Sequence, residues 1–194
     1  EPTFDAQDMR NMGGLRKHMR TTFWVYLIGA VALAGVFPFA GFWSKDEILA
    51  DAWLIGNEGQ WHGWAVYGLL TVAAFFTAFY MGRQIFMVFY GGERTEAAKH
   101  AHESPAVMTV PLIILAVLST VGGAMNLPKF VPGGEALGQW IERTVEVHPV
   151  DFQLTVALIS TAVALAGIGL SYLVYGQKPM MTMTDPLQSI GGLF

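Results

Sequence analysis

Hydrophobic residues are gathered into four long stretches that polar segments separate. The stretches cover residues 22–55, 62–90, 106–127 and 152–175. The second contains one charged residue, Arg83, and the last two contain none. A helix of about 20 apolar residues crosses the hydrocarbon core of a bilayer. The pattern therefore predicts an all-α fold, a polytopic transmembrane helical bundle of about four spans.

The first stretch, 22–55, fits neither one straight span nor two. A straight helix of this length would measure about 50 Å, against a hydrocarbon core of about 30 Å, and two spans would need about 40 residues and a turn. Pro38 removes a helical hydrogen bond, and Gly35 and Gly41 allow the backbone to open on either side. We therefore expect a discontinuous transmembrane helix, broken at Pro38. Broken backbone at membrane depth needs protein or a wet cavity to satisfy its polar groups, as an ion pathway does.

Polar segments lie between and beyond these stretches. Their polar composition predicts a basic loop over residues 1–21, a second loop over 91–105 and a polar tail over 176–194. All three are expected on one side of the membrane. The segment 128–151 is expected to be a loop on the opposite side. Apolar residues at three- and four-residue steps within it predict a short interfacial helix. They are Leu137, Trp140, Ile141 and Val145.

Counting Lys and Arg in alternate loops gives the orientation of the chain. Seven basic residues fall on the side of the chain's two ends: Arg10, Arg16, Lys17, Arg20, Arg94, Lys99 and Lys178. The opposite side has two, Lys129 and Arg143. This bias places both ends of the chain on the cytoplasmic side. Dividing 22–55 into two spans would weaken the bias to six against three.

The composition excludes several classes of protein. Hydrophobic residues make up 53% of the 194 residues and charged residues 13%, about half of the share usual in soluble domains. A net charge of −4 without a basic patch argues against nucleic acid as a partner. The absence of cysteine excludes disulfides and thiolate metal sites. The pair His100 and His102 lacks a third defined metal ligand, which favours a solvated loop.

Lys45 and Arg83 are the two basic residues outside these loops. The helical neighbours of Lys45 are apolar: Gly41, Phe42, Ile48 and Leu49. An ionisable group within a span marks a proton or ion route by default, and desolvation disfavours the charged form of a lysine there. Lys45 is therefore a candidate for proton transfer. The alternative is an ordinary flanking lysine that reaches the interface.

Asp46, Glu47 and Arg83 are the other charged residues within or beside the first two apolar stretches that need an interpretation. Asp46 is either a partner in proton exchange or part of a hydrated helix end, and Glu47 fits the hydrated end better. Arg83 does not give up its proton in proteins. Three roles are then open to Arg83: an electrostatic role along a pathway, a pair with a carboxylate of another segment, or contact with the lipid headgroups. Its position near the end of 62–90 favours contact with the headgroups.

Several motifs together resemble one family. They are Gln7–Arg16, Ala32–Leu49, Tyr80–Phe86, His102–Pro105 and Asp185–Leu187. They are similar to subunit L of bacterial respiratory NADH-quinone oxidoreductase (complex I), an antiporter-like membrane subunit. The run from Gly41 to Leu49 is the most specific of them. The chain also begins without methionine, and the resemblance implies a C-terminal-half fragment of a longer subunit.

The resemblance implies a function and a set of partners. The fragment would hold the discontinuous twelfth helix of the family and three later spans, with Lys45 at the position of the family's proton-transferring lysine. The family commonly has a second proline where this chain has Phe37. The subunit itself would bind no cofactor. NADH, FMN, iron–sulfur clusters and quinone would belong to partner subunits of the enzyme complex.

The same resemblance implies a place in the cell. The chain would cross the bacterial inner membrane several times, surrounded by the lipid bilayer and other membrane-arm subunits, especially the neighbouring antiporter-like subunit. Two alternatives remain. One is a subunit of a multisubunit cation/proton antiporter, which shares the broken-helix architecture. The other is a structural membrane module in which Lys45 only anchors a helix at the interface.

Overall fold

The computed structural model describes residues 7–123, 140, 152–177, 181 and 184–187. Within these ranges the chain forms helices, turns and connections, with no β-strand. The predicted all-α fold is therefore confirmed for this part of the chain. The predicted interfacial helix within 128–151 lies, apart from Trp140, outside the described residues.

The described helices follow one another along most of the chain. They are η1 (Met9–Asn11), η2 (Leu15–Lys17), α1 (Arg20–Ala34), α2 (Ala40–Asn57), α3 (Trp61–Phe89), α4 (Glu96–Lys99), α5 (Ala106–Val121), α7 (Leu154–Ser171) and η4 (Tyr172–Gly176). The short helices η1 and η2 are 3₁₀ helices, and η4 is a π-helical continuation of α7.

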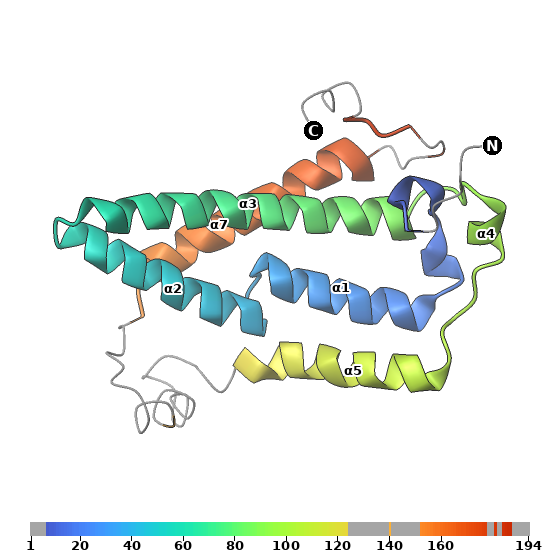
Figure 1. Ribbon diagram of the computed structural model, residues 1–194, viewed down its shortest axis with the longest axis horizontal. Helices are drawn as coiled ribbons and strands as arrows, with labels where there is room; N and C mark the ends of the chain where they lie inside the picture. The colour runs from blue at the N-terminus through green and yellow to red at the C-terminus, as the bar shows by residue number, and fades with distance from the viewer. Residues whose placement is uncertain (1–6, 124–139, 141–151, 178–180, 182–183, 188–194) are drawn as a thin grey trace.

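The longest helix, α3, organises the bundle. Figure 1 shows α1 and α2 placed end to end in one row, with α3 running alongside both. Helix α7 crosses α3, and α5 lies against α1 on the other side of the row. The two halves of the stretch 22–55 thus pack together against a single helix.

The break between α1 and α2 is built from local backbone geometry. Gly35 adopts the left-handed conformation, with φ 78°, and its N–H bonds the carbonyl of Ala32. The N–H of Val36 bonds the carbonyl of Val31, which completes a Schellman motif. A turn over Val36–Phe39 follows, with a cis Phe37–Pro38 peptide bond, and α2 begins at Ala40. The break therefore forms although the chain has Phe37 in place of a second proline.

Small residues bring α1, α3 and α7 together near this break. Ala34, Ala78 and Ala164 form one buried cluster. Gly167 of α7 lies directly against the backbone of α3, since a Cβ at this position would be 2.6 Å from the carbonyl oxygen of Phe75. Such close approach is typical of helices packed within membranes.

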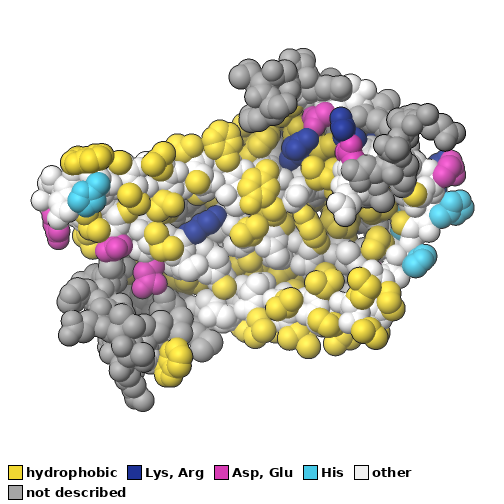
Figure 2. All heavy atoms as spheres, in the orientation of Figure 1, with side chains coloured by type: hydrophobic (Ala, Val, Ile, Leu, Met, Phe, Trp, Pro, Cys, Tyr) yellow, Lys and Arg dark blue, Asp and Glu magenta, His cyan; other side chains and the backbone are white. Residues whose placement is uncertain are grey.

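Two of the described helices, α3 and the continuous α7–η4, are long and apolar enough to cross a membrane. The apolar helices α1 and α5 have 15 and 16 residues, or about 22–24 Å at 1.5 Å per residue. Hydrophobic side chains cover the middle of the face in Figure 2, and most charged side chains gather toward its two ends. This distribution fits a bundle surrounded by lipid or by other membrane helices.

Candidate functional site

Lys45 lies on the second turn of α2, and its side chain turns back toward α1. Its Nζ donates a 2.8 Å hydrogen bond to the carbonyl oxygen of Leu33. The last four carbonyls of a helix have no partner within that helix, and this bond satisfies one of them. The ammonium also lies at the negative end of the α1 dipole. Lys45 therefore joins the two halves of the broken helix.

Gly35 makes room for the Lys45 side chain. A Cβ at Gly35 would lie 3.0 Å from Lys45 Cδ and 3.5 Å from Lys45 Nζ. A larger residue would also be strained by the positive φ of this position. Within the described part of the chain, Lys45 forms no ion pair with a carboxylate. The polar group that the described structure shows in contact with this cation is the backbone carbonyl of Leu33.

The break lies close to the middle of the bundle along the axis of α3. Ala34, beside Leu33, packs in the same cluster as Ala78 of α3. Ala78 precedes the last residue of α3, Phe89, by eleven positions, a distance of about 16 Å along the helix. The ammonium of Lys45 reaches the same level through its bond to Leu33.

Asp46 faces away from the break and into the bundle. It is 3% exposed, whereas Glu47 and Asp51 on the same helix are exposed. The hydroxyl of Ser160 on α7 lies 3.3 Å from Asp46 Oδ1 and 3.1 Å from the carbonyl oxygen of Ala157. Lys45 and Asp46 are adjacent in sequence but contact different helices. The structure therefore does not bring them together as an ion pair.

Arg83 pairs with a carboxylate from another segment, which was one of the alternatives open from the sequence. Its Nη2 lies 2.5 Å from Asp185 Oδ2, and its Nε donates to the Tyr175 hydroxyl at 3.1 Å. Tyr175 in turn donates to Asp185 Oδ1 at 2.9 Å. This cluster ties the chain after α7 to the C-terminal part of α3. It lies in a different part of α3 from the Ala78 cluster beside the break.

Asp185 also accepts a 2.9 Å bond from the backbone N–H of Leu187. Burial raises the pKa of this carboxyl, but the hydrogen bonds from Leu187, Arg83 and Tyr175 outweigh burial and leave the pKa below its ordinary value. Asp185 is therefore ionised at neutral pH and neutralises Arg83.

The sequence did not identify Ser160, Tyr175 or Asp185 as partners of the predicted site residues. Ser160 stands in an uncharged helix, and its hydroxyl is one of few polar groups there. A buried carboxylate on a neighbouring helix needs such a partner. From the sequence one could therefore predict that a buried Asp46 has a hydroxyl partner, but not that this partner is Ser160.

Glu103 has a structural role at the start of α1. Its carboxylate accepts bonds from the N–H of Thr21 at 2.6 Å and from the hydroxyl of Thr22 at 2.6 Å. Burial raises the pKa of Glu103, but these bonds prevail and lower it. His100 and His102 are exposed. Among the described residues, no group of three or more His, Asp or Glu side chains is placed to hold a metal ion.

A helix broken inside a membrane bundle, with a cation at the break, is an arrangement used by ion-translocating membrane proteins. Comparison with known proteins agrees with this class. Residues 2–77, which include the break and Lys45, match the family described as "NADH:quinone oxidoreductase/Mrp antiporter, TM".

Individual relatives extend the similarity along the chain. It is 38% identical to NAD(P)H-quinone oxidoreductase chain 5 of Picosynechococcus, over 89% of this chain and 28% of the relative. It is 37% identical to NADH-quinone oxidoreductase subunit L of Mycobacterium tuberculosis, over 91% of this chain and 27% of the relative. F(420)H(2) dehydrogenase subunit L of Methanosarcina mazei is 35% identical, over 94% of this chain and 25% of the relative.

These matches confirm the resemblance to subunit L that the sequence motifs predict. The chain spans about a quarter of the length of these relatives.

Proposed function

We propose that this chain is part of a proton-translocating membrane-arm subunit of a quinone oxidoreductase complex. In this proposal four spans cross the membrane: the broken α1–α2 helix, α3, a span containing α5, and α7 with η4. Quinone reduction elsewhere in the complex changes the charge of buried groups along the membrane arm. Lys45 receives a proton from this chain of groups and releases it to the outer side.

The depth of Lys45 carries this proposal. If α3 leaves the hydrocarbon core near Phe89, the level of Ala78 is about 16 Å inside it, close to the middle of a core about 30 Å thick. An interfacial lysine extends outward to the headgroups. The Lys45 side chain instead extends back to Leu33, toward the middle. A cation held at this depth by a backbone carbonyl is expected to serve ion movement.

Asp46 and Arg83 have different parts in the proposal. Asp46, buried against Ser160 of α7, is a candidate to exchange protons with the pathway through the Ser160 hydroxyl. Arg83 is bound to Asp185 and keeps its proton. We assign Arg83 a positioning role, in which it holds the chain after α7 against α3, together with a fixed positive charge at that end of the bundle.

The partners follow from the relatives. Their names specify NADH, NAD(P)H or F(420)H(2) as electron donor, although this chain is similar to all of them. The shared segment therefore serves a step that does not depend on the donor, and proton translocation is such a step. Flavin, iron–sulfur clusters and quinone belong to other subunits in this proposal. The chain lies in the bacterial inner membrane, beside another antiporter-like subunit.

A second candidate is a subunit of a multisubunit cation/proton antiporter, because the matched family description names the Mrp antiporter as well. The two candidates differ in their partners. Purification of the intact complex with subunits that oxidise NADH and contain iron–sulfur clusters supports the oxidoreductase. Purification without them supports the antiporter.

The test of the pump uses a Lys45→Ala variant of the full-length subunit in its complex. NADH-driven proton uptake into vesicles is measured beside NADH oxidation, so that protons are counted per electron. We expect the ratio to fall while the complex still assembles. An assembled complex with an unchanged ratio would exclude Lys45 as a required carrier and leave it a structural residue.

A further inference from the structure

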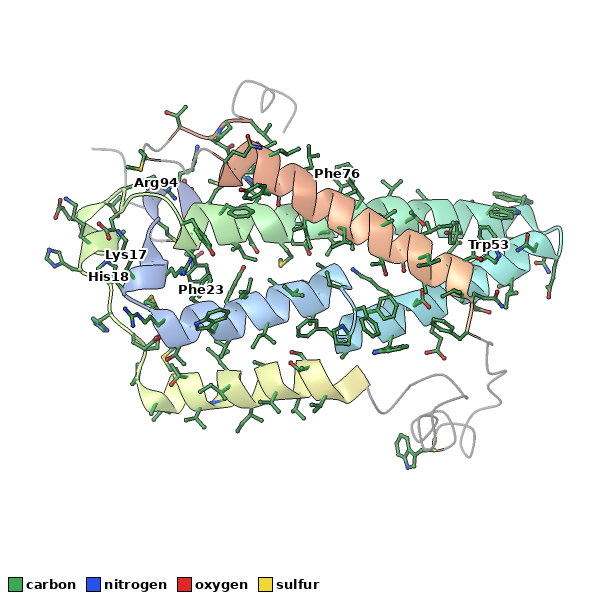
Figure 3. The ribbon with its side chains drawn as sticks, turned by 180° about the vertical axis from the view of Figure 1, so that it is seen from behind. Lys17, His18, Phe23, Trp53, Phe76 and Arg94 are labelled. Carbon is green, nitrogen blue, oxygen red and sulfur yellow. The ribbon has the colours of Figure 1, made fainter. Side chains whose placement is uncertain are left out.

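A cavity of about 530 Å³ opens where η2, the start of α1 and the end of α3 meet. Three basic side chains line it, Arg16, Lys17 and Arg20, together with aromatic side chains that include Trp24 and Tyr90. Lys17 and Phe23, which also lines the cavity, lie at the same end of the molecule in Figure 3. The volume is in the range of small-molecule binding sites.

The Arg16 side chain is exposed, and neutral groups orient it without a carboxylate. Its Nη1 donates to the Tyr90 hydroxyl at 3.1 Å, and its guanidinium lies 5.2 Å from the centre of the Tyr90 ring and 5.4 Å from that of Phe23. These contacts are neutral, so they orient the charge without cancelling it. A held guanidinium of this kind suits bidentate recognition of a phosphate.

The carboxylates nearby are already engaged. Glu93 bonds His18 at 3.0 Å and lies 3.8 Å from Lys17, and Glu103 caps α1 through Thr21 and Thr22. Neither carboxylate is among the residues that line the cavity. Within the described part of the chain, Arg16 and Arg20 form no ion pair. The cavity therefore has an excess of positive charge.

The cavity lies where the apolar helices end. Helix α1 begins at Arg20 and α3 ends at Phe89, and polar segments continue from both. Trp24, at the start of the second turn of α1, is 59% exposed. Tryptophan and tyrosine at the end of a membrane helix are typical of the headgroup layer. The basic loops of this side point to the cytoplasmic leaflet, which carries anionic lipids.

We propose that this cavity binds the phosphate headgroup of an anionic phospholipid. Arg16 and Arg20 hold the phosphate oxygens, Lys17 adds charge at the rim, and Trp24 packs beside the glycerol and upper acyl region. Free phosphate shares the charge but lacks a hydrophobic part to use Trp24. The site depends on membrane placement and is independent of proton transfer by Lys45.

The test uses the full-length subunit in its purified, delipidated complex and a photoreactive phosphatidylglycerol with its reactive group near the headgroup. We expect labelling of the peptide that contains Arg16 and Trp24. The double variant Arg16→Gln, Arg20→Gln is expected to weaken binding about 30-fold, because each basic residue near an anionic lipid surface contributes about a factor of five. The variant Arg10→Gln is the matched control, since Arg10 pairs with Asp8 and does not line the cavity.

Three outcomes would overturn the proposal. They are equal labelling by a zwitterionic phosphatidylethanolamine probe, loss of labelling when millimolar inorganic phosphate competes, and labelling that the double variant leaves unchanged. The first denies charge selection and the second assigns the cavity to free phosphate. The third denies that Arg16 and Arg20 hold the headgroup. Proton counting with Lys45→Ala is a separate measurement, so either proposal can fail without the other.

Discussion

The ammonium of Lys45 on α2 binds the carbonyl oxygen of Leu33 on α1, 2.8 Å away across the break in the helix. One side chain thus closes the end of α1 and places a cation beside it. A charged ammonium is attracted by the negative end of the α1 dipole, and a neutral amine is not. The protonation state of Lys45 is therefore linked to how firmly the two helix halves are joined.

Replacement of Lys45 by Arg or Met separates these two roles. Arginine retains a charged donor that can bind Leu33 but does not release a proton, and methionine retains the size alone. We expect both variants to lower the number of protons pumped per electron, because neither side chain can release a proton at this site. We expect only Lys45→Met to lower thermal stability, by about 1 kcal/mol for the lost bond. Vesicle acidification and thermal unfolding of the purified complex measure the two effects.

Lys99→Met is the control for this pair of variants. Lys99 is half-exposed and bonds Glu96 within the short helix α4, so its loss is expected to leave pumping unchanged. Normal pumping by Lys45→Arg would show that the site needs a charge there and not an exchangeable proton.

Asp46 and Ser160 are expected to be coupled. The Ser160 hydroxyl has one hydrogen, and both Asp46 Oδ1 and the Ala157 carbonyl oxygen lie within reach of it. A protonated Asp46 resolves this competition by donating to Ser160 Oγ, and an Asn side chain can donate from the same position. We therefore expect Asp46→Asn to assemble normally and Ser160→Ala to lose about 1–2 kcal/mol of stability. A double-mutant cycle with Asp46→Ala should give a coupling above about 0.5 kcal/mol.

Thr161→Ala is the matched control on the same helix. The Thr161 hydroxyl donates to the carbonyl of Ala157 at 2.8 Å within α7. Its removal therefore measures the effect on stability of losing a hydroxyl that does not contact Asp46. If Thr161→Ala and Ser160→Ala have equal effects and neither couples to Asp46, the link between α2 and α7 is not stabilising.

Infrared spectra should show a protonated carboxyl band that Asp46→Asn removes.

Gly167 and Gly169 of α7 are expected to respond differently to alanine. A Cβ at Gly167 would lie 2.6 Å from the Phe75 carbonyl oxygen and 2.9 Å from Ala78 Cβ, whereas none of the atoms described lies within 4 Å of one at Gly169. Gly167→Ala should force α7 away from α3 and lower thermal stability by about 1–3 kcal/mol. Gly169→Ala should be neutral or slightly stabilising. Equal effects would mean that α3 and α7 do not pack closely in the intact subunit.

The break in the helix was predictable because its causes are local. Pro38 lacks an N–H, and Gly35 can adopt the positive φ that ends α1. Both properties belong to the residues themselves. The apolar length of 22–55 then favoured one interrupted helix over two spans, and in the structure α1 ends at Ala34 and α2 begins at Ala40.

The contacts of the site were not predictable in the same way. Lys45 binds a backbone carbonyl, a group that every residue carries and that no sequence pattern distinguishes. Arg83 was expected to reach the headgroups, because its distance along the helix allowed it, yet its partner Asp185 lies 102 positions away. Such pairings depend on how helices pack, which hydrophobic periodicity alone does not specify.

The ion pair of Arg83 and Asp185 is expected to hold the chain after α7 in place. Asp185→Asn leaves a partly buried guanidinium without a counter-charge, and we expect a loss of about 1–3 kcal/mol. Tyr175→Phe retains the ion pair and removes one hydroxyl, so its loss should be smaller, near 1 kcal/mol. Thermal unfolding of the purified complex, with limited proteolysis after α7, measures both. An Asp185→Asn variant no weaker than Tyr175→Phe would contradict a stabilising role for the pair.

The same pair sets a pH dependence whose sign follows from Asp185. The pKa of this carboxyl in the folded chain is below its ordinary value because hydrogen bonds from Leu187, Arg83 and Tyr175 outweigh burial. A depressed pKa adds stability above the unfolded value, about 4, and this stability is lost as pH falls through the folded value. The stability gap between the native chain and Asp185→Asn should therefore be constant from pH 8 to about pH 5 and shrink below about pH 4. A gap that instead grew on acidification would mean that Asp185 is held protonated, and that Arg83 is neutralised by another group.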